Sequence, residues 1–205
     1  MTEPADEATA ARHRAKMEKR KAVQDAEVAG KTLEKGLLIV HTGPGKGKST
    51  AAFGLALRIL GRGHRIGVVQ FVKGAWHTAE RDALKAFGDQ VAWYTMGEGF
   101  TWETQDLARD ITAAERAWGK SLELMADPSF ALVILDELNI ALRYEYLDLA
   151  TVVAALTARR SGLHVVVTGR NAKPELVAAA DLVTEMTLVK HHFAAGVKAQ
   201  PGIEF

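Results

Sequence analysis

A stretch rich in glycine and lysine, VHTGPGKGKST, occupies residues 40–50 and combines residue types that bind phosphate. The apolar run GLLIV leads into it, and a helical pattern, STAAFGLALRIL, follows. In that setting glycines let backbone N–H groups turn inward around phosphate oxygens, and the helix start adds partial positive charge. Lys48 would reach phosphate oxygens, and Ser49 would ligate Mg²⁺ through its hydroxyl. The stretch therefore predicts a phosphate-binding loop rather than a glycine-rich turn without a ligand.

The loop is one residue shorter than the usual template, which has four residues between its first glycine and the closing Gly-Lys-Ser/Thr. Here only Pro44, Gly45 and Lys46 separate Gly43 from Gly47. We expect the missing residue to change the path of the loop, and Lys46 to offer the phosphates a second cation.

Two acidic residues, Asp136 and Glu137, end the apolar run ALVIL. In phosphate-loop proteins such a pair lies beside the loop and holds Mg²⁺, directly or through water. Glu137 could instead activate water, as in motor ATPases, or the pair could simply cap a helix. Arg170 follows another predicted strand at the same edge, where its guanidinium could fork onto phosphate or form a structural salt bridge. The sequence thus predicts a ligand edge but leaves the role of Glu137 open.

Two aromatic residues, Phe100 and Trp102, lie in the glycine-containing stretch MGEGFTWETQ after a predicted strand. Aromatic side chains at a ligand edge can stack on a large planar ligand, although a curved loop can also bring them into the core. The histidines do not predict a metal site, because His191 and His192 are adjacent and would diverge on a helix.

Short, β-branched apolar runs alternate with helical patterns from Lys35 onward. This alternation predicts an α/β fold with a mainly parallel sheet and helices on both faces. With the phosphate loop, it indicates a single P-loop NTPase-like (RecA-like) domain over residues 35–205. The predicted buried strands are GLLIV, RIGVVQFV, QVAWYTM, FALVILDE, GLHVVVTG and DLVTEMTLV, and the predicted helices are 48–60, 79–87, 104–126, 147–160 and 173–180.

Composition limits the remaining possibilities. The 205 residues carry a formal net charge of +1, which gives no general case for nucleic-acid or membrane binding. Cysteine is absent, which excludes Cys-ligated metals, thiol nucleophiles and disulfides. Without an apolar leader or a long apolar run, we expect a cytoplasmic protein. Residues 1–34 form a basic arm, partly helical or flexible, which could be a frayed tail or could fold over a ligand or a partner subunit.

Several motifs together resemble one known family. TGPGKGKSTAAFG, VVQFVKGAW, GFTWETQ, LDEL, TGRNAKPEL and VKHHFAAGVKAQPGIEF are similar, in this order, to the phosphate-loop adenosyltransferases that act on cob(I)alamin or cob(I)yrinic acid a,c-diamide. The resemblance implies transfer of the 5′-deoxyadenosyl group of ATP to reduced corrinoid cobalt, with release of triphosphate. It also implies a homodimer in which the arm of one subunit closes over the nucleotide site of the other.

The resemblance assigns roles to individual residues. It places the triphosphate on Gly43–Thr50, and magnesium or manganese on Ser49 and Glu137. It makes Arg170 and Arg58 ATP-site arginines and presses Phe100 and Trp102 against the lower face of the corrinoid. Pro44 departs from the family, whose familiar members have Asn there, because proline lacks the side-chain amide and the backbone N–H that could contact phosphate or ribose. The residues of the loop that we expect to bind ATP are Gly43, Gly45, Lys46, Gly47, Lys48, Ser49 and Thr50.

The implied chemistry agrees with the residues present. Cob(I) cobalt is itself a strong nucleophile, so the protein has only to align the reactants and stabilise the departing triphosphate. Lys46, Lys48, Arg170 and Mg²⁺ would do this. An external reduced flavin or flavoprotein is implied as the source of cob(I). The competing function is a P-loop ATPase or kinase in which Glu137 activates water or a substrate hydroxyl. The natural corrinoid, whether from de novo synthesis or salvage, stays open.

Overall fold

A computed structural model describes residues 7–72, 78–97 and 106–204. The chain divides into two compact units, Met1–Glu34 and Lys35–Phe205. In the first unit, helix α1 runs over Glu7–Ala29 and exposes its few apolar side chains, including Val23 and Val28. The arm therefore contains a long helix that buries almost nothing within its own unit.

The second unit is built around a parallel sheet. Its strands are β1 (Leu38–Thr42), β2 (Arg65–Gln70), β3 (Val91–Thr95), β4 (Phe130–Asp136), β5 (His164–Thr168) and β6 (Leu182–Glu185). Over the described residues they form one six-stranded sheet in the order β3-β2-β4-β5-β1-β6, with every pairing parallel. Its helical elements are α2 (Lys48–Leu60), α3 (Ala79–Leu84), η1 (Lys85–Gln90), α5 (Leu107–Ala126), α6 (Leu138–Arg143), α7 (Leu149–Thr157), α8 (Pro174–Ala179) and η2 (His192–Ala195).

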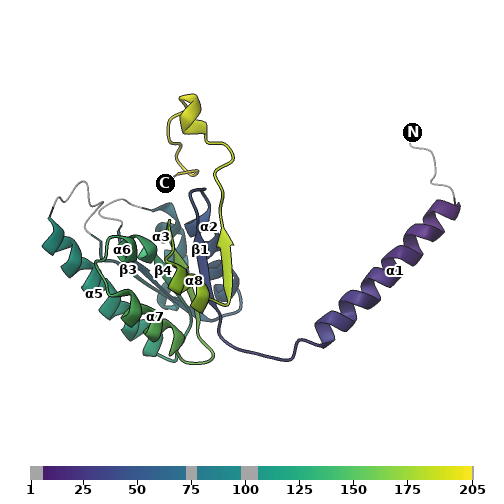
Figure 1. Ribbon diagram of the computed structural model, residues 1–205, viewed down its shortest axis with the longest axis horizontal. Coiled ribbons are helices and arrows are strands. Elements are labelled where there is room, and N and C mark those ends of the chain that lie inside the picture. The colour runs from purple at the N-terminus through teal and green to yellow at the C-terminus, as the bar shows by residue number, and fades with distance from the viewer. Residues whose placement is uncertain (1–6, 73–77, 98–105, 205) are drawn as a thin grey trace. The chain divides into compact units, whose positions relative to one another are not determined.

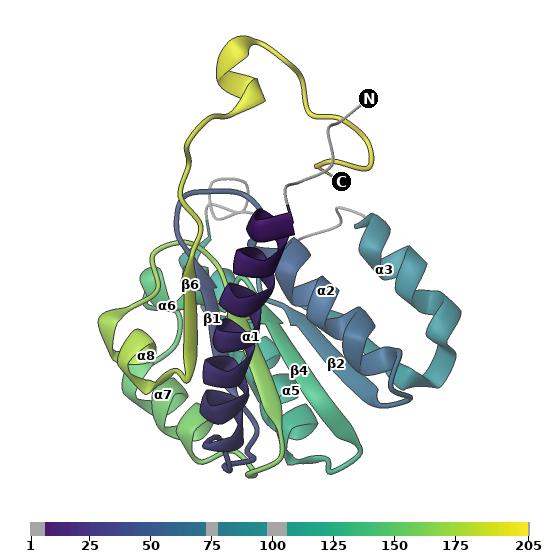
Figure 2. The same ribbon diagram turned by 90° about the vertical axis from the view of Figure 1, so that its right-hand side faces the viewer.

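Helices cover both faces of this sheet (Figures 1 and 2). Alternate residues of β4 show why: Leu132 and Ile134 pack in one core with α2 and α3, whereas Val133 and Leu135 pack in another with α5 to α8. A strand buried on both faces needs apolar residues throughout, which explains the continuous apolar runs of the sequence. The predicted α/β fold class, with a mainly parallel sheet and helices on both faces (Figures 1 and 2), is confirmed.

The outer strands differ from the prediction of uniformly buried strands. All four residues of β6 are exposed, and Leu182 keeps 46% of its surface accessible. Strand β3 at the opposite edge is only half-buried. Within the described part of the chain, each of these two strands has a hydrogen-bonded neighbour on one side only. A local apolar pattern does not show whether a strand lies at the edge or in the centre of a sheet, so the sequence did not predict this exposure.

Several helix boundaries also changed. Helix α2 has the predicted bounds, but the predicted helix 79–87 is α3 followed by the 3₁₀ helix η1. Helices α5 and α7 start later than predicted because Asp106 and Asp148 cap them, each accepting a hydrogen bond from the backbone N–H three residues on. Helix α6 was not predicted.

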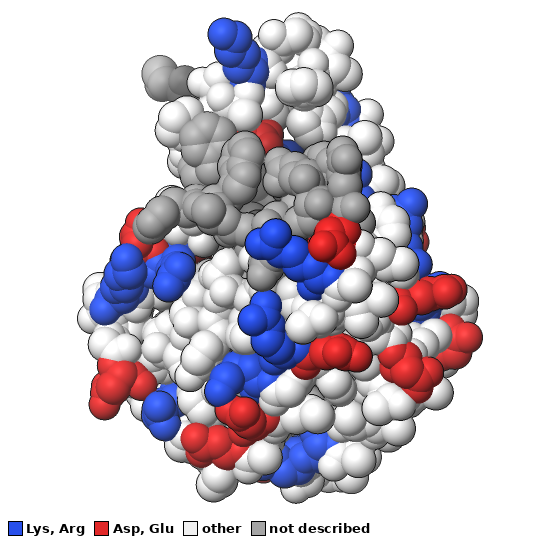
Figure 3. Space-filling view, turned by 90° about the vertical axis from the view of Figure 1, so that its left-hand side faces the viewer, with Lys and Arg blue, Asp and Glu red and all other residues white. Residues whose placement is uncertain are grey.

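Charged side chains are interspersed over the face shown in Figure 3, where lysines and arginines alternate with acidic residues. This distribution agrees with a net charge of +1. Among the described helices, none combines the length and the apolar character that crossing a membrane requires.

Candidate active site

The predicted phosphate-binding loop joins the end of β1 to the start of α2, between the two elements that the sequence placed around it. Gly43 and Gly47 have φ values of 96° and 103°, a left-handed conformation that favours glycine. The Lys48 ammonium donates hydrogen bonds to the carbonyl oxygens of Gly43 (3.0 Å) and Gly45 (2.7 Å). The lysine is thereby folded back over its own loop and keeps only 8% of its surface exposed.

The segment that follows β6 braces this short loop. The Gly45 N–H donates to the Met186 carbonyl at 2.6 Å, and the Met186 N–H donates to the Thr42 carbonyl at 2.9 Å. A Cβ atom on Gly43 or Gly45 would lie 2.5 Å from the Met186 or the Thr187 carbonyl oxygen, respectively. Backbone packs directly on backbone here, so both positions require glycine for space.

The Asp136 carboxylate, fully buried at the end of β4, organises the polar end of the sheet. Its Oδ1 accepts hydrogen bonds from Ser49 Oγ (2.7 Å) and Thr168 Oγ1 (2.8 Å). Its Oδ2 accepts from Gln70 Nε2 (3.0 Å). Three neighbouring elements thus converge on one carboxylate, which fixes the Ser49 hydroxyl at the start of α2.

Gln70 extends this network toward the edge of the sheet. Its Oε1 accepts hydrogen bonds from Trp93 Nε1 (3.1 Å) and Thr95 Oγ1 (3.0 Å), so its amide has one preferred orientation. Gln70 and Thr168 were not singled out from the sequence. The signal was present, because each is a polar residue that directly follows a run of apolar residues at the end of its strand.

Glu137 adopts the left-handed conformation, with φ 64° and ψ 22°. A non-glycine residue held there costs about 1–3 kcal/mol, and such residues cluster at functional sites. The Glu137 N–H donates to Thr168 Oγ1 at 2.9 Å, which holds the sharp turn between β4 and α6. The Glu137 side chain lines a cavity above the phosphate loop, whereas Asp136 lies buried beneath it.

That cavity has a volume of about 510 Å³. Residues 45–50 form its floor, Glu137 and Arg170 line it from the neighbouring strand ends, and Ala79, Glu80 and Ala83 contribute from α3. Residues 202–204 of the C-terminal segment complete the lining. Among the described residues, the cations that line it are Lys46, Lys48 and Arg170.

Burial and the neighbouring charges act on the pKa of Lys48. Burial lowers the pKa of Lys48; the negative charge of Glu137 acts against this, while Arg170 and Lys46 lower the pKa further. Cations crowded in this way favour an anion as ligand, because an anion would relieve their mutual repulsion and stabilise the charged form of Lys48.

Outside the loop, the cavity lining does not account for three of the predicted site residues. Arg58 is exposed in the last turn of α2 and is not among the residues that line the cavity, so its role as an ATP-site arginine stays a prediction. Phe100 and Trp102, the predicted corrinoid contacts, lie outside the described residues.

Comparison with known proteins identifies the family. Residues 34–205 match the family model of the ATP:corrinoid adenosyltransferases BtuR/CobO/CobP. Residues 1–28 match a second family model, which describes the N-terminal part of cob(I)alamin adenosyltransferases. The corrinoid adenosyltransferase of Pseudomonas aeruginosa is 56% identical over 95% of this chain and 96% of its own. The corrinoid adenosyltransferase CobA of Salmonella typhimurium is 45% identical over 95% of this chain and 98% of its own. Among solved structures, the RadB recombinase overlaps 80% of each chain at 18% identity and a TM-score of 0.45, which is too slight a likeness to support an inference. The family match and these identities over almost the whole chain show that the protein belongs to the ATP:corrinoid adenosyltransferases of the BtuR/CobO/CobP family.

Proposed function

We propose that the protein holds the triphosphate of ATP over the loop Gly43–Thr50 and transfers the 5′-deoxyadenosyl group to the cob(I) cobalt of a corrinoid. The activity is that of its family. The observation that carries the assignment to this site is the convergence of Lys46, Lys48 and Arg170 on one cavity above the short loop. Of the two substrates, ATP and the corrinoid, ATP carries the triphosphate, whose negative charge these cations would bind.

The reaction needs little acid–base chemistry from the protein. The electron pair of cob(I) forms the new cobalt–carbon bond at the 5′ carbon of ATP. The bond between that carbon and its oxygen breaks, and the electron pair leaves with the triphosphate. The protein aligns the cobalt, the carbon and the leaving group, and its cations stabilise the charge that gathers on the triphosphate.

A magnesium or manganese ion fits the same cavity. The Ser49 hydroxyl stands at the start of α2, held by the Asp136 carboxylate, and the Glu137 carboxylate lines the cavity. Hydroxyl and carboxylate oxygens are the ligands that these hard cations prefer. Ser49 and Glu137 would hold the ion, which would neutralise part of the triphosphate charge.

The corrinoid side of the proposal depends on Phe100 and Trp102. Bulky aromatic side chains without a strong metal ligand suit the exclusion of the lower axial ligand of the corrinoid, which would leave cob(II) four-coordinate and easier to reduce. An external reduced flavin or flavoprotein then supplies the electron. Replacing both residues with Ala should slow turnover from cob(II) strongly, and chemically reduced cob(I) should restore much of it. Equal losses in both assays would instead indicate damage to binding or folding.

We also propose that the protein is a homodimer in which α1 closes over the nucleotide site of the partner subunit. In support, α1 is a 23-residue helix with exposed apolar residues, and residues 1–28 match a separate N-terminal family model. A chain that starts at Gly30 should stay folded and retain ATP less well. If it turns over like the full chain, the arm has no closing role.

The products of the reaction test the main proposal against an ATPase or kinase. An adenosyltransferase leaves all three phosphates joined, whereas an ATPase or kinase breaks the bond to the γ-phosphorus and yields ADP. Phosphorus NMR of a completed reaction should show triphosphate formed one-for-one with adenosylated corrinoid, and little ATP consumed without reduced corrinoid. Sustained formation of ADP in the absence of a corrinoid would make Glu137 a water-activating residue.

A further inference from the structure

The C-terminal segment, residues 191–204, comes back to the phosphate loop. The Lys46 ammonium forms an ion pair with Glu204 Oε2, and Gly202, Ile203 and Glu204 line the cavity. The Glu204 side chain is 17% exposed and that of Lys46 is 47% exposed. The carboxylate is therefore the more firmly enclosed member of the pair, and the lysine is the member free to adjust.

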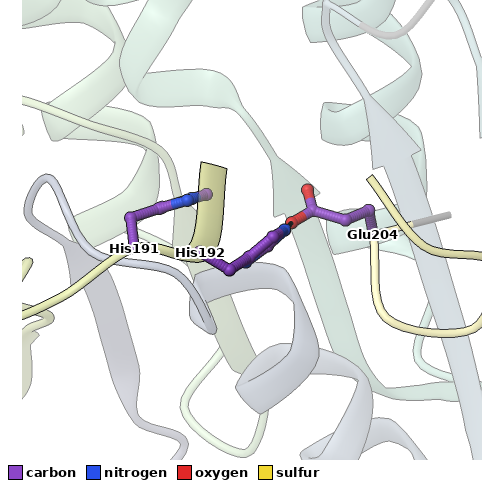
Figure 4. A group of neighbouring side chains, drawn as sticks. All are labelled: His191, His192 and Glu204. Atoms are coloured by element: carbon purple, nitrogen blue, oxygen red, sulfur yellow. Dashed lines mark ion pairs between the residues drawn. The ribbon is translucent and has the colours of Figure 1, made fainter. Parts of the chain in front are cut away.

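Glu204 also faces a second part of the same segment. His192 Nε2 lies 3.2 Å from Glu204 Oε1, and Figure 4 shows the edge of the His192 ring turned toward the carboxylate. The His191 ring stacks on that of His192, with 4.8 Å between centroids and 23° between planes. The prediction that these histidines diverge was wrong, because His191 is extended and only His192 begins the 3₁₀ helix η2.

His191, His192 and Glu204 also resemble a metal-binding group, since one potential ligand atom of each lies within 4.8 Å of the others. The contacts already present weaken that interpretation. Lys46 occupies one oxygen of Glu204, and His191 Nδ1 accepts a hydrogen bond from the Phe193 N–H at 3.1 Å. A metal ion on the other oxygen, Glu204 Oε1, would lie close to the Lys46 ammonium, and the two positive charges would repel each other.

The ion pair leaves Lys46 able to bind phosphate. An ammonium group has three N–H donors, and Glu204 takes one of them. Lysine also has a long stem that loses much rotamer freedom when it is ordered. A carboxylate that already holds the ammonium beside the cavity orders the side chain in the free enzyme, so less conformational entropy is lost when ATP binds.

We propose that Glu204 is a positioning residue that holds Lys46 in place for the triphosphate of ATP. The inference rests on the proposed function and adds the C-terminal segment to the nucleotide site. The hydrogen bond from Lys46 lowers the pKa of Glu204, and the charges of Lys46, His192 and His191 act in the same direction. The carboxylate is thus charged at neutral pH, as a partner for Lys46 must be.

A double-mutant cycle tests this role. Glu204→Gln keeps the shape of the side chain and removes its charge, and it should raise the Kd for inorganic triphosphate and the KM for ATP about two- to fivefold, as expected for a partly exposed ion pair. The kcat at saturating ATP should change less. In a Lys46→Met background the same change should have no further effect on either constant. Glu123→Gln, which removes the Lys120–Glu123 pair of α5, is the matched control and should bind like the wild type.

Calorimetry with inorganic triphosphate and steady-state kinetics with ATP give the two readouts. A lower Kd in Glu204→Gln would mean that Glu204 competes with phosphate for Lys46, and it would overturn the proposal. An unchanged Kd, or equal losses with and without the lysine, would overturn it as well. The adenosyltransferase assignment is judged separately, since triphosphate formation by the wild-type enzyme does not depend on this cycle.

Discussion

Replacing Asp136 with Asn should destabilise the domain through hydrogen bonding alone, because the two side chains have almost the same shape. Among the described residues, Ser49, Thr168 and Gln70 donate hydrogen bonds to this fully buried carboxylate. Asn exchanges one of the accepting oxygens for an NH₂ donor. Whichever way the new amide turns, at least one buried donor loses its acceptor.

Neighbouring contacts block the simplest escape. Gln70 could turn its own amide round, but its Oε1 accepts from Trp93 and Thr95 and would be replaced there by a donor. One unsatisfied buried donor costs about 1–3 kcal/mol, and each of the two remaining bonds loses about 1 kcal/mol when its acceptor becomes neutral. The expected loss in the free energy of unfolding is therefore about 3–5 kcal/mol.

A compensating substitution makes the reasoning refutable. Gln70→Glu in the same chain turns the donor that faces position 136 into an acceptor and leaves an oxygen for Trp93 and Thr95. The double variant should recover about half of the loss, whereas Gln70→Glu alone places two carboxylates face to face and should destabilise. Urea unfolding followed by circular dichroism measures all four proteins. If the double variant loses as much free energy of unfolding as the two single variants together, hydrogen-bond complementarity does not stabilise this network.

Three further predictions concern the loop and the strand before it. Lys48→Ala should weaken ATP binding or turnover by about 2–4 kcal/mol, as for loss of one preorganised electrostatic donor, and unchanged affinity and turnover would contradict the site. Gly45→Ala should disrupt the loop, because the new Cβ would lie 2.5 Å from the Thr187 carbonyl oxygen. Gly54→Ala should instead raise the melting temperature slightly, because alanine favours the helix and its Cβ at this position of α2 would meet no atom within 4 Å. Burial lowers the pKa of His41 below its usual value of 6.5. As the pH falls below 6.5, the histidine is therefore protonated in the unfolded chain before it is protonated in the folded one, and the free energy of unfolding should decrease. His41→Asn should make this acid loss of unfolding free energy shallower by about one proton, and an identical slope would refute the assignment.

The sequence predicted those parts of the site in which local pattern and structure coincide. The loop from Gly43 to Ser49 lies between a strand and a helix, and α2 has the predicted bounds. Glycines, a lysine and a hydroxyl at fixed spacing need no knowledge of distant residues. The fold class followed for the same reason, because strand and helix periods are local properties.

Features that depend on distant contacts could not be predicted in this way. Helix α6 has six residues and follows directly after Glu137, whose positive φ is held by Thr168 on another strand. The contact between Glu204 and Lys46 joins the two ends of the domain, and nothing in the sequence near either residue indicates it. Tertiary contacts decide such positions, so local propensity is silent about them.

The place of β1 in the sheet also determines when the site can form during synthesis. Its neighbours are β5 and β6, and the Leu37 N–H donates to His164 Nδ1 across 127 residues of sequence. A ribosome that makes the chain from its N-terminus releases the phosphate loop long before either neighbouring strand exists. Until almost the whole domain has emerged, β1 therefore has no neighbouring strand, and the loop lacks its hydrogen bond to Met186. The nascent chain gains the ability to bind nucleotide as one of its last folding steps, and a chaperone that shields β1 would act over most of translation.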